Sequence, residues 1–202
     1  MTTVRVLSSE ELAIAVGAIQ RLVDIEVPLA EVLIKYCIVR EFKKKTILVD
    51  VGGMENYVNI VIKGLVRKFA RKGKSEFTLQ LATEGHLIHS EIAFIKQIPS
   101  PVVIECIEPT VMLSLGYTQM IKALDSVVGG ERMARQIMQL MFAKKDDRMY
   151  KLLQQTPKER FLDFIENNSH LLQRVPQKYL ASYLNIKPET FSRMKHLVKR
   201  KS

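Results

Sequence analysis

The spacing of apolar residues changes from a helical to a strand-like period in the first third of the chain. Ser9 is a polar cap for "EELAIAVGAIQRLV", in which Leu12, Val16, Ile19 and Val23 recur at helical steps. A second helix is predicted from Leu29 to Cys37, after Pro28. From Phe42 onward the period is about two, which indicates strands.

Short strands separated by turn-forming residues follow as far as residue 115. They are "TILVDVGG", "YVNIVIKG", the two arms of "LVRKFARKGKSEFTLQLATEG", and "PVVIECIEPTVMLSL", which is broken at Glu108 and Pro109. In the third segment the turn contains Lys72, Gly73 and Lys74. Strands spaced this closely favour an antiparallel barrel or roll.

A long helix is predicted after the glycine pair at residues 129 and 130. Apolar residues recur there at three- and four-residue steps, at Met133, Ile137, Leu140, Met141, Met149 and Leu152. Charged residues 144–147 interrupt this face, so part of the helix is expected to cover the strands. Thr156 and Pro157 then form a cap and first position for "KERFLDFIENN", whose packing face is Phe161, Phe164 and Ile165.

Two short helices joined by a tight turn are predicted at the C-terminal end. The first runs from Gln177 to Leu184, with Leu180, Ala181 and Leu184 turned inward. Asn185 suits the turn because Asn tolerates the left-handed conformation. The second begins at Pro188, and its cap position holds Lys187, which is not a preferred cap.

The second helix has one polar and one apolar face. Glu189, Ser192 and Arg193 share the polar face, and Phe191, Met194 and Val198 share the apolar one. An Arg fork can bond guanine, a carboxylate can accept from cytosine, and Ser suits either partner. Lys195, Lys199, Arg200 and Lys201 suit phosphates, and Gln177 and Lys178 would lie near the duplex backbone. An ordinary helical hairpin with a solvated basic face explains the spacing equally well.

Composition favours a polyanionic partner. The chain has 202 residues, 47% of them apolar, and a formal net charge of +10. From Lys187 to the end there are six Lys or Arg residues against a single Glu. Cys37 and Cys106 both lie in apolar sequence and are expected to be buried free thiols, which suits a cytoplasmic location. No signal peptide, membrane span, metal-binding spacing, P-loop or nucleophile–base motif is evident, so we expect neither an enzyme nor a bound cofactor.

The C-terminal motif resembles a known family. "PETFSR" at residues 188–193, preceded by "VPQKYLASYLNI" at 175–186, is similar to the helix-turn-helix of Crp/Fnr transcription regulators. In that family the Glu, Ser and Arg of an E-T-x-S-R core contact bases, which implies Glu189, Ser192 and Arg193. The full predicted DNA-binding set comprises Glu189, Thr190, Ser192, Arg193, Lys195, Gln177 and Lys178.

Residues 5–117 resemble the cyclic-nucleotide-binding β-roll of the same family in the order of their glycines, at Gly52 or Gly53, Gly64 and Gly85. The phosphate cassette departs from the family pattern. Ser90 replaces its Gly, Glu91 matches its Glu, and residues 99–101 replace its Arg and Ser/Thr. Because no Arg is present to hold a phosphate, we expect no cyclic AMP binding in the usual mode, and Glu91 to serve as a turn residue. Candidate effector-binding residues are Gly85, Ser90, Glu91 and Ser100.

Together the patterns and the resemblance predict an α+β fold. Residues 1–117 form an N-terminal antiparallel β-roll of the double-stranded β-helix or jelly-roll type, 118–155 a linker and long dimerisation helix, and 156–202 a winged-helix-like helix-turn-helix domain. The resemblance implies a cytoplasmic homodimer that binds an inverted repeat in double-stranded DNA, with RNA polymerase and a small-molecule effector as further partners. The alternative is a small-molecule sensor module that acts through a protein partner.

Overall fold

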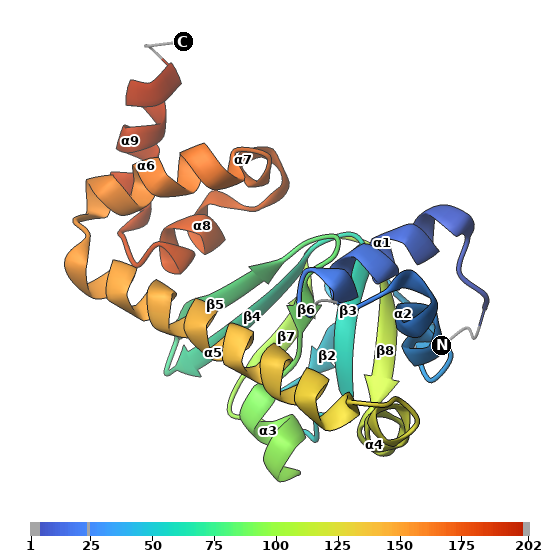
Figure 1. Ribbon diagram of the computed structural model, residues 1–202. Helices are drawn as coiled ribbons and strands as arrows, with labels where there is room; N and C mark the ends of the chain where they lie inside the picture. The colour runs from blue at the N-terminus through green and yellow to red at the C-terminus, as the bar shows by residue number, and fades with distance from the viewer. Residues whose placement is uncertain (1–4, 24, 200–202) are drawn as a thin grey trace. The chain divides into compact units, whose positions relative to one another are not determined.

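A computed structural model describes residues 5–23 and 25–199 (Figure 1). The chain divides into two compact units. The first comprises Leu81–Met141 and the described residues up to Lys68. The second comprises Phe69–Gln80 and the described residues from Phe142 onward.

The first unit begins with two helices, whose ends differ from the prediction. Helix α1 spans Ser9–Gln20, and its cap is Ser8, because Ser8 and Glu11 form a reciprocal capping box. Helix α2 spans Val27–Ile34 and ends earlier than expected. Strand β1, Ile38–Phe42, begins after three intervening residues and pairs antiparallel with β8.

The described strands form two four-stranded sheets. Their orders are β1-β8-β3-β6 and β2-β7-β4-β5, and the first contains antiparallel pairs throughout. The remaining bounds are β2 Ile47–Val49, β3 Tyr57–Lys63, β4 Val66–Lys72, β5 Ser75–Ala82, β6 Leu87–Ile88, β7 Val103–Cys106 and β8 Thr110–Gly116. The predicted strands and hairpin are therefore present. β4 and β5 form a hairpin whose end, Phe69–Gln80, is assigned to the second unit.

Two short helices accompany the sheets. Helix α3, Glu91–Lys96, follows β6, and helix α4, Tyr117–Asp125, follows β8 and was not predicted. The core between helices and sheet contains Ala15, Val16, Ala18, Ile19, Val39, Ile60, Ile62 and Leu113, among others. Both cysteines are free thiols, Cys106 buried and Cys37 half-buried. Burial raises the pKa of the Cys37 thiol to about 12.

Helix α5 is a single helix over Gly130–Gln154. Near its start, Met133 and Ile137 pack into the core of the first unit, as one of the two predicted uses of its apolar face requires. Five large apolar or aromatic side chains of α5 are exposed, at Met138, Phe142, Met149, Tyr150 and Leu153. Of these only Met149 belonged to the predicted face.

The second unit is built mainly from short helices. They are α6 Pro157–Asn168, α7 Leu171–Arg174, α8 Gln177–Tyr183 and α9 Pro188–Lys199. Thr156 caps α6 in a capping box with Glu159, as predicted, and Phe161 and Phe164 are buried beneath it. Every described element after β8 is a helix, so the described residues there contain no wing strand. In the described part of the chain, no helix is long and apolar enough to span a bilayer.

Candidate nucleic-acid interface

The link between α8 and α9 is a tight turn with a defined hydrogen-bond pattern. Asn185 has φ of 53°, in the left-handed region. The N–H of Ile186 donates to the Ala181 carbonyl at 3.0 Å, and that of Asn185 to the Ser182 carbonyl at 3.1 Å. This pair of bonds is a Schellman motif with Asn in the place usually held by Gly. The predicted turn at Asn185 is therefore confirmed.

An aromatic contact fixes how α9 is rotated about its axis. The Phe191 side chain is fully buried, and its ring meets that of Phe161 edge to face, with centroids 5.3 Å apart. Leu180, Ala181 and Leu184 of the predicted inner face of α8 are buried alongside. Because Phe191 anchors one side of α9, residues two positions away in either direction are turned toward solvent.

The polar face of α9 is solvent-accessible, as the sequence predicted. Glu189 and Arg193 are exposed one turn apart, and Thr190, Ser192 and Lys195 are half-buried around them. Within the described residues, no hydrogen bond or ion pair engages the side chain of Glu189 or Arg193. A helix presenting an unengaged guanidinium and carboxylate together can offer donors and acceptors to an external partner.

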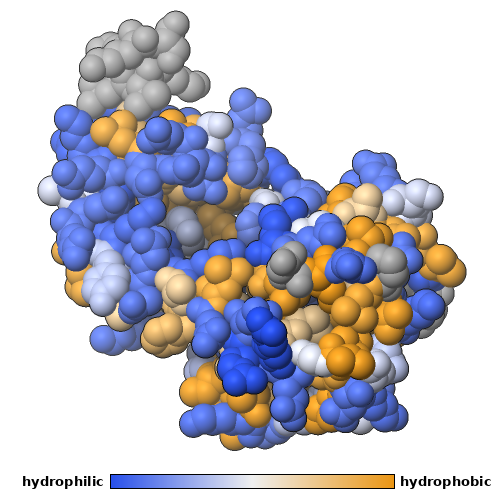
Figure 2. All heavy atoms as spheres, in the orientation of Figure 1, coloured by the Kyte–Doolittle hydropathy of each residue, from blue (hydrophilic) through white to orange (hydrophobic). Residues whose placement is uncertain are grey.

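The remaining predicted contact residues lie on α8 and at the end of α9. Gln177 and Lys178 are exposed in the first turn of α8, with the Lys178 ammonium 4.9 Å from the Tyr179 ring centroid. The Lys199 backbone ends α9. Arg200 and Lys201 lie outside the described residues. Figure 2 shows the visible face of the second unit as mostly hydrophilic, with apolar atoms gathering over the first unit.

The predicted effector residues of the first unit form hydrogen bonds and ion pairs with one another and with their neighbours. Glu91 is the first residue of α3, and its carboxylate accepts from the Lys68 ammonium at 2.6 Å. Lys68 also donates to the His89 carbonyl at 3.0 Å. Burial opposes ionisation of Glu91, but the Lys68 charge outweighs it and lowers the pKa of Glu91 to about 2. Glu91 is thus the partner of a buried cation rather than only a turn residue.

Ser90 and Ser100 are joined within the same region. The Ser100 hydroxyl donates to the Ser90 Oγ at 2.9 Å, and both residues are almost fully buried. The Ser90 N–H donates to the Glu55 carboxylate at 3.1 Å. Burial raises the pKa of Glu55, and the N–H groups of Ser90 and Tyr57 oppose that rise. These side chains satisfy one another without a ligand.

Gly85 has a structural reason for being glycine. Its φ is 78°, and a Cβ there would collide with the Arg21 guanidinium, which donates to the Gly85 carbonyl at 3.3 Å. The structure therefore brings Ser90, Glu91 and Ser100 together around α3, while Gly85 shapes the turn before β6.

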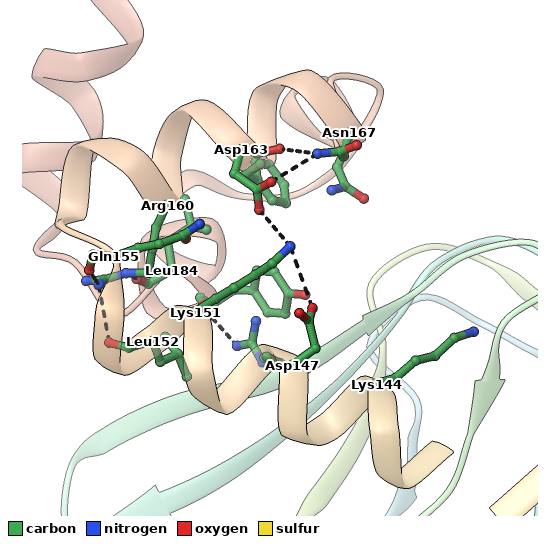
Figure 3. A pocket seen from close by; sticks show the side chains of 13 residues that line it. Lys144, Asp147, Lys151, Leu152, Gln155, Arg160, Asp163, Asn167 and Leu184 are labelled. Atoms are coloured by element: carbon green, nitrogen blue, oxygen red, sulfur yellow. Dashed lines mark hydrogen bonds and ion pairs between the residues drawn. The ribbon is translucent and has the colours of Figure 1, made fainter. Parts of the chain in front are cut away.

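A polar cleft of about 260 Å³ lies in the second unit, lined by residues of α5, α6 and α8 (Figure 3). Across it the Lys151 ammonium points between two carboxylates, at 3.6 Å from Asp147 and 3.3 Å from Asp163. Arg148 and Arg160 also line the cleft. Apart from Asp147, in the charged run 144–147, these residues were not predicted as a site, because nothing in the local pattern distinguishes them from solvated helix charges.

Similar solved structures establish the fold. FixK2 from Bradyrhizobium japonicum superposes with a TM-score of 0.70 at 18% identity, covering 82% of this chain and 85% of that one. The c-di-GMP-responsive global regulator CLP of Xanthomonas campestris gives 0.67 at 14%, covering 87% and 93%. The catabolite activator protein of Thermus thermophilus gives 0.58 at 17%, covering 91% and 87%.

These neighbours are Crp/Fnr family regulators, so the chain has the fold of that group and the predicted fold class is confirmed. No protein-family model and no curated protein matches the sequence.

Proposed function

We propose that the chain is a sequence-specific DNA-binding transcription regulator of the Crp/Fnr type, with α9 as its recognition helix. The observation that carries the proposal is the exposed, unengaged pair Glu189 and Arg193, held outward by the buried Phe191. The fold shared with regulators of that family supports it. We propose a cytoplasmic location for the protein, as part of the same function.

Base recognition would rest on the side chains of the first turns of α9. Arg193 would form a bidentate contact with guanine, Glu189 would accept from a cytosine amino group, and Ser192 would bond either partner. Thr190, Lys195, Gln177 and Lys178 would contact phosphates or base edges around them. Each bidentate pair contributes roughly 1–3 kcal/mol of discrimination.

In this proposal, two copies of the chain pair through helix α5 to form a homodimer. Met138, Phe142, Met149 and Leu153 are exposed along one helix, at successive steps of four, seven and four residues, which place them on one face as in a coiled-coil seam. Crp/Fnr regulators act as dimers. Two copies paired in this way would bind half-sites about 34 Å apart in an inverted repeat.

We propose further that cyclic AMP is not the effector in the usual mode. The Glu91 carboxylate, which would be needed for a ribose, is engaged by Lys68 at 2.6 Å. Ser100 lies between two prolines, which lack the N–H groups that a phosphate cradle needs. Regulation through RNA polymerase is part of the same proposal, and transcription in vitro from a promoter carrying the operator tests it.

Selection from random-sequence DNA tests the function. The purified full chain should enrich an inverted repeat. Arg193→Lys keeps the charge but removes the fork, so affinity for the operator should fall by about 10- to 100-fold while binding to random DNA and its salt dependence stay unchanged. Lys158→Ala, which removes an exposed cation on α6, is the matched control and should change operator affinity by less than about threefold.

Two outcomes would contradict the proposal. Equal loss by Arg193→Lys on operator and random DNA would remove the base-contacting role of Arg193. Failure of the wild-type chain to enrich any sequence would favour a sensor module that acts through a protein partner.

A further inference from the structure

A buried arginine connects the end of α5 to the turn before α9. Arg160, in the first turns of α6, is only 8% exposed. Its Nε donates to the Leu184 carbonyl at 2.8 Å and its Nη2 to the Asn185 carbonyl at 3.3 Å. Its Nη1 donates to the carbonyls of Leu152, at 3.4 Å, and Gln155. Figure 3 shows Arg160 extending toward Gln155 and Leu184.

These contacts satisfy groups that a helix end leaves without partners. The last carbonyls of an α-helix have no intrahelical donor, and Leu152 and Gln155 are at the end of α5. The carbonyls of Leu184 and Asn185 belong to the end of α8 and its turn. A planar fork with five N–H donors can serve both sets at once. No carboxylate pairs with Arg160 among the described residues.

A second arginine reaches the same turn from α5 itself. The Arg148 guanidinium lies 3.8 Å from the Tyr183 ring centroid and donates to the Tyr183 carbonyl at 2.8 Å. Burial lowers the pKa of Arg148, and the neighbouring Tyr183 opposes that change. Two guanidiniums therefore hold three consecutive carbonyls, those of Tyr183, Leu184 and Asn185.

We propose that Arg160 and Arg148 are positioning residues that set the placement of α9 relative to α5, and we call their contacts with residues 183–185 the α5–turn joint. This inference rests on the proposed function and deepens it. If α5 pairs two copies, the α5–turn joint fixes the distance and angle between the two recognition helices. The joint consists of the chain's own side chains and backbone, so it is formed without an effector.

A rigid joint predicts a strict preference for one half-site spacing. Inserting one base pair moves a half-site by about 3.4 Å and rotates it by about 35°. A dimer with fixed recognition helices cannot follow that change, whereas a dimer with a loosened joint can. The dependence of affinity on spacing therefore reports on the joint, and a general loss of stability does not reproduce it.

The experiment measures binding of the full chain to the selected operator and to versions with one or two base pairs inserted or removed at its centre. The wild type should lose at least about tenfold in affinity for each altered spacing. Arg160→Lys should bind the original operator about tenfold more weakly, but its affinity should change by less than about threefold across the series. Lys151→Met, which removes only the two partly exposed ion pairs of the same cleft, should keep the wild-type profile.

A second pair of variants covers the case in which Arg160→Lys is too unstable to assay. Arg148→Met should flatten the spacing profile, and Tyr183→Phe, which keeps the ring and the carbonyl, should not. Variants that lose the same factor at every spacing, or that keep the wild-type profile, would overturn the α5–turn joint alone. A wild-type chain that selects no operator would overturn the proposed function as well.

Discussion

At the scale of single residues, the buried charges distinguish this chain from a nucleotide-binding roll. Burying an ion is costly unless a partner and further hydrogen bonds compensate. Lys68 has both, in the Glu91 carboxylate and the His89 carbonyl. The Lys68–Glu91 ion pair therefore lies in the region of the predicted effector cassette, and it forms without a ligand.

Replacing Glu91 tests this pair. Glu91→Gln leaves the Lys68 ammonium buried without its counterion, so the free energy of unfolding at pH 7 should fall by about 3 kcal/mol. Because the folded-state pKa of Glu91 is lowered to about 2, the wild-type advantage is present above the unfolded pKa of about 4.3 and is lost as the pH falls toward 2. Urea denaturation between pH 2 and 7 measures both effects.

Two controls make this result specific. Glu31→Gln, at an exposed site on α2, should change stability by less than about 0.5 kcal/mol. Adding Lys68→Met to Glu91→Gln should cost less than the two single changes together, because the double variant leaves no unpaired charge. Additive losses would show that Lys68 and Glu91 do not act as a pair.

The residues that could be predicted from sequence are those whose neighbours are close along the chain. Glu189, Ser192 and Arg193 share a face by helical periodicity alone, and the exposure of Glu189 and Arg193 agrees with it. Lys68 and Arg160 could not be found in this way. Their partners are 23 and 24 residues distant, at Glu91 and Leu184, and a Lys or Arg in isolation is normally solvated.

At the scale of elements, capping and turn residues predict a helix end well where adjacent residues alone determine it. Thr156 and Asn185 are found as predicted, because a capping box and a left-handed turn are decided by a few adjacent residues. β1 was missed because its pairing partner lies in β8, 68 to 76 residues away along the chain. Helices α4 and α7 were not predicted because they are short, with nine and four residues.

The turn between α8 and α9 gives a second test. Asn185→Gly should leave the free energy of unfolding almost unchanged, because Gly adopts the left-handed conformation freely. Asn185→Val should lower it by about 1–2 kcal/mol, because a branched side chain is strained at φ of 53°. Thermal unfolding of the full chain measures the difference. A Val variant as stable as the Gly variant would mean that the turn changes conformation at little cost.

At the scale of the whole molecule, the proposed pairing through α5 would determine whether two copies of α9 can act together on DNA. The exposed apolar face of α5 was predicted only in part, because a helix that covers the roll with one face and would pair with a second copy through another carries two overlapping apolar patterns. Met133 and Ile137 belong to the first pattern, and Phe142 and Leu153, which are 72% and 76% exposed, belong to the second.

Phe142→Glu should therefore separate the dimer. A carboxylate at the seam would have to lose its hydration on pairing, so the dissociation constant of the dimer should rise by about 100-fold or more. Because one recognition helix alone makes few base contacts, affinity for the inverted repeat should fall with it, while affinity for a single half-site stays the same. Sedimentation velocity and titration of both DNAs with the same samples measure this.

Two control variants distinguish the effect of a charge placed at the proposed seam from the effect of a charge added elsewhere on α5. Phe142→Leu keeps an apolar side chain and should remain dimeric. Ala143→Glu places the same carboxylate about 100° around the helix, at an exposed position away from the seam, and should also remain dimeric. If Phe142→Glu sediments as the wild type does and still binds the inverted repeat tightly, α5 does not pair through this face, and the half-site spacing must be set by another surface of the molecule.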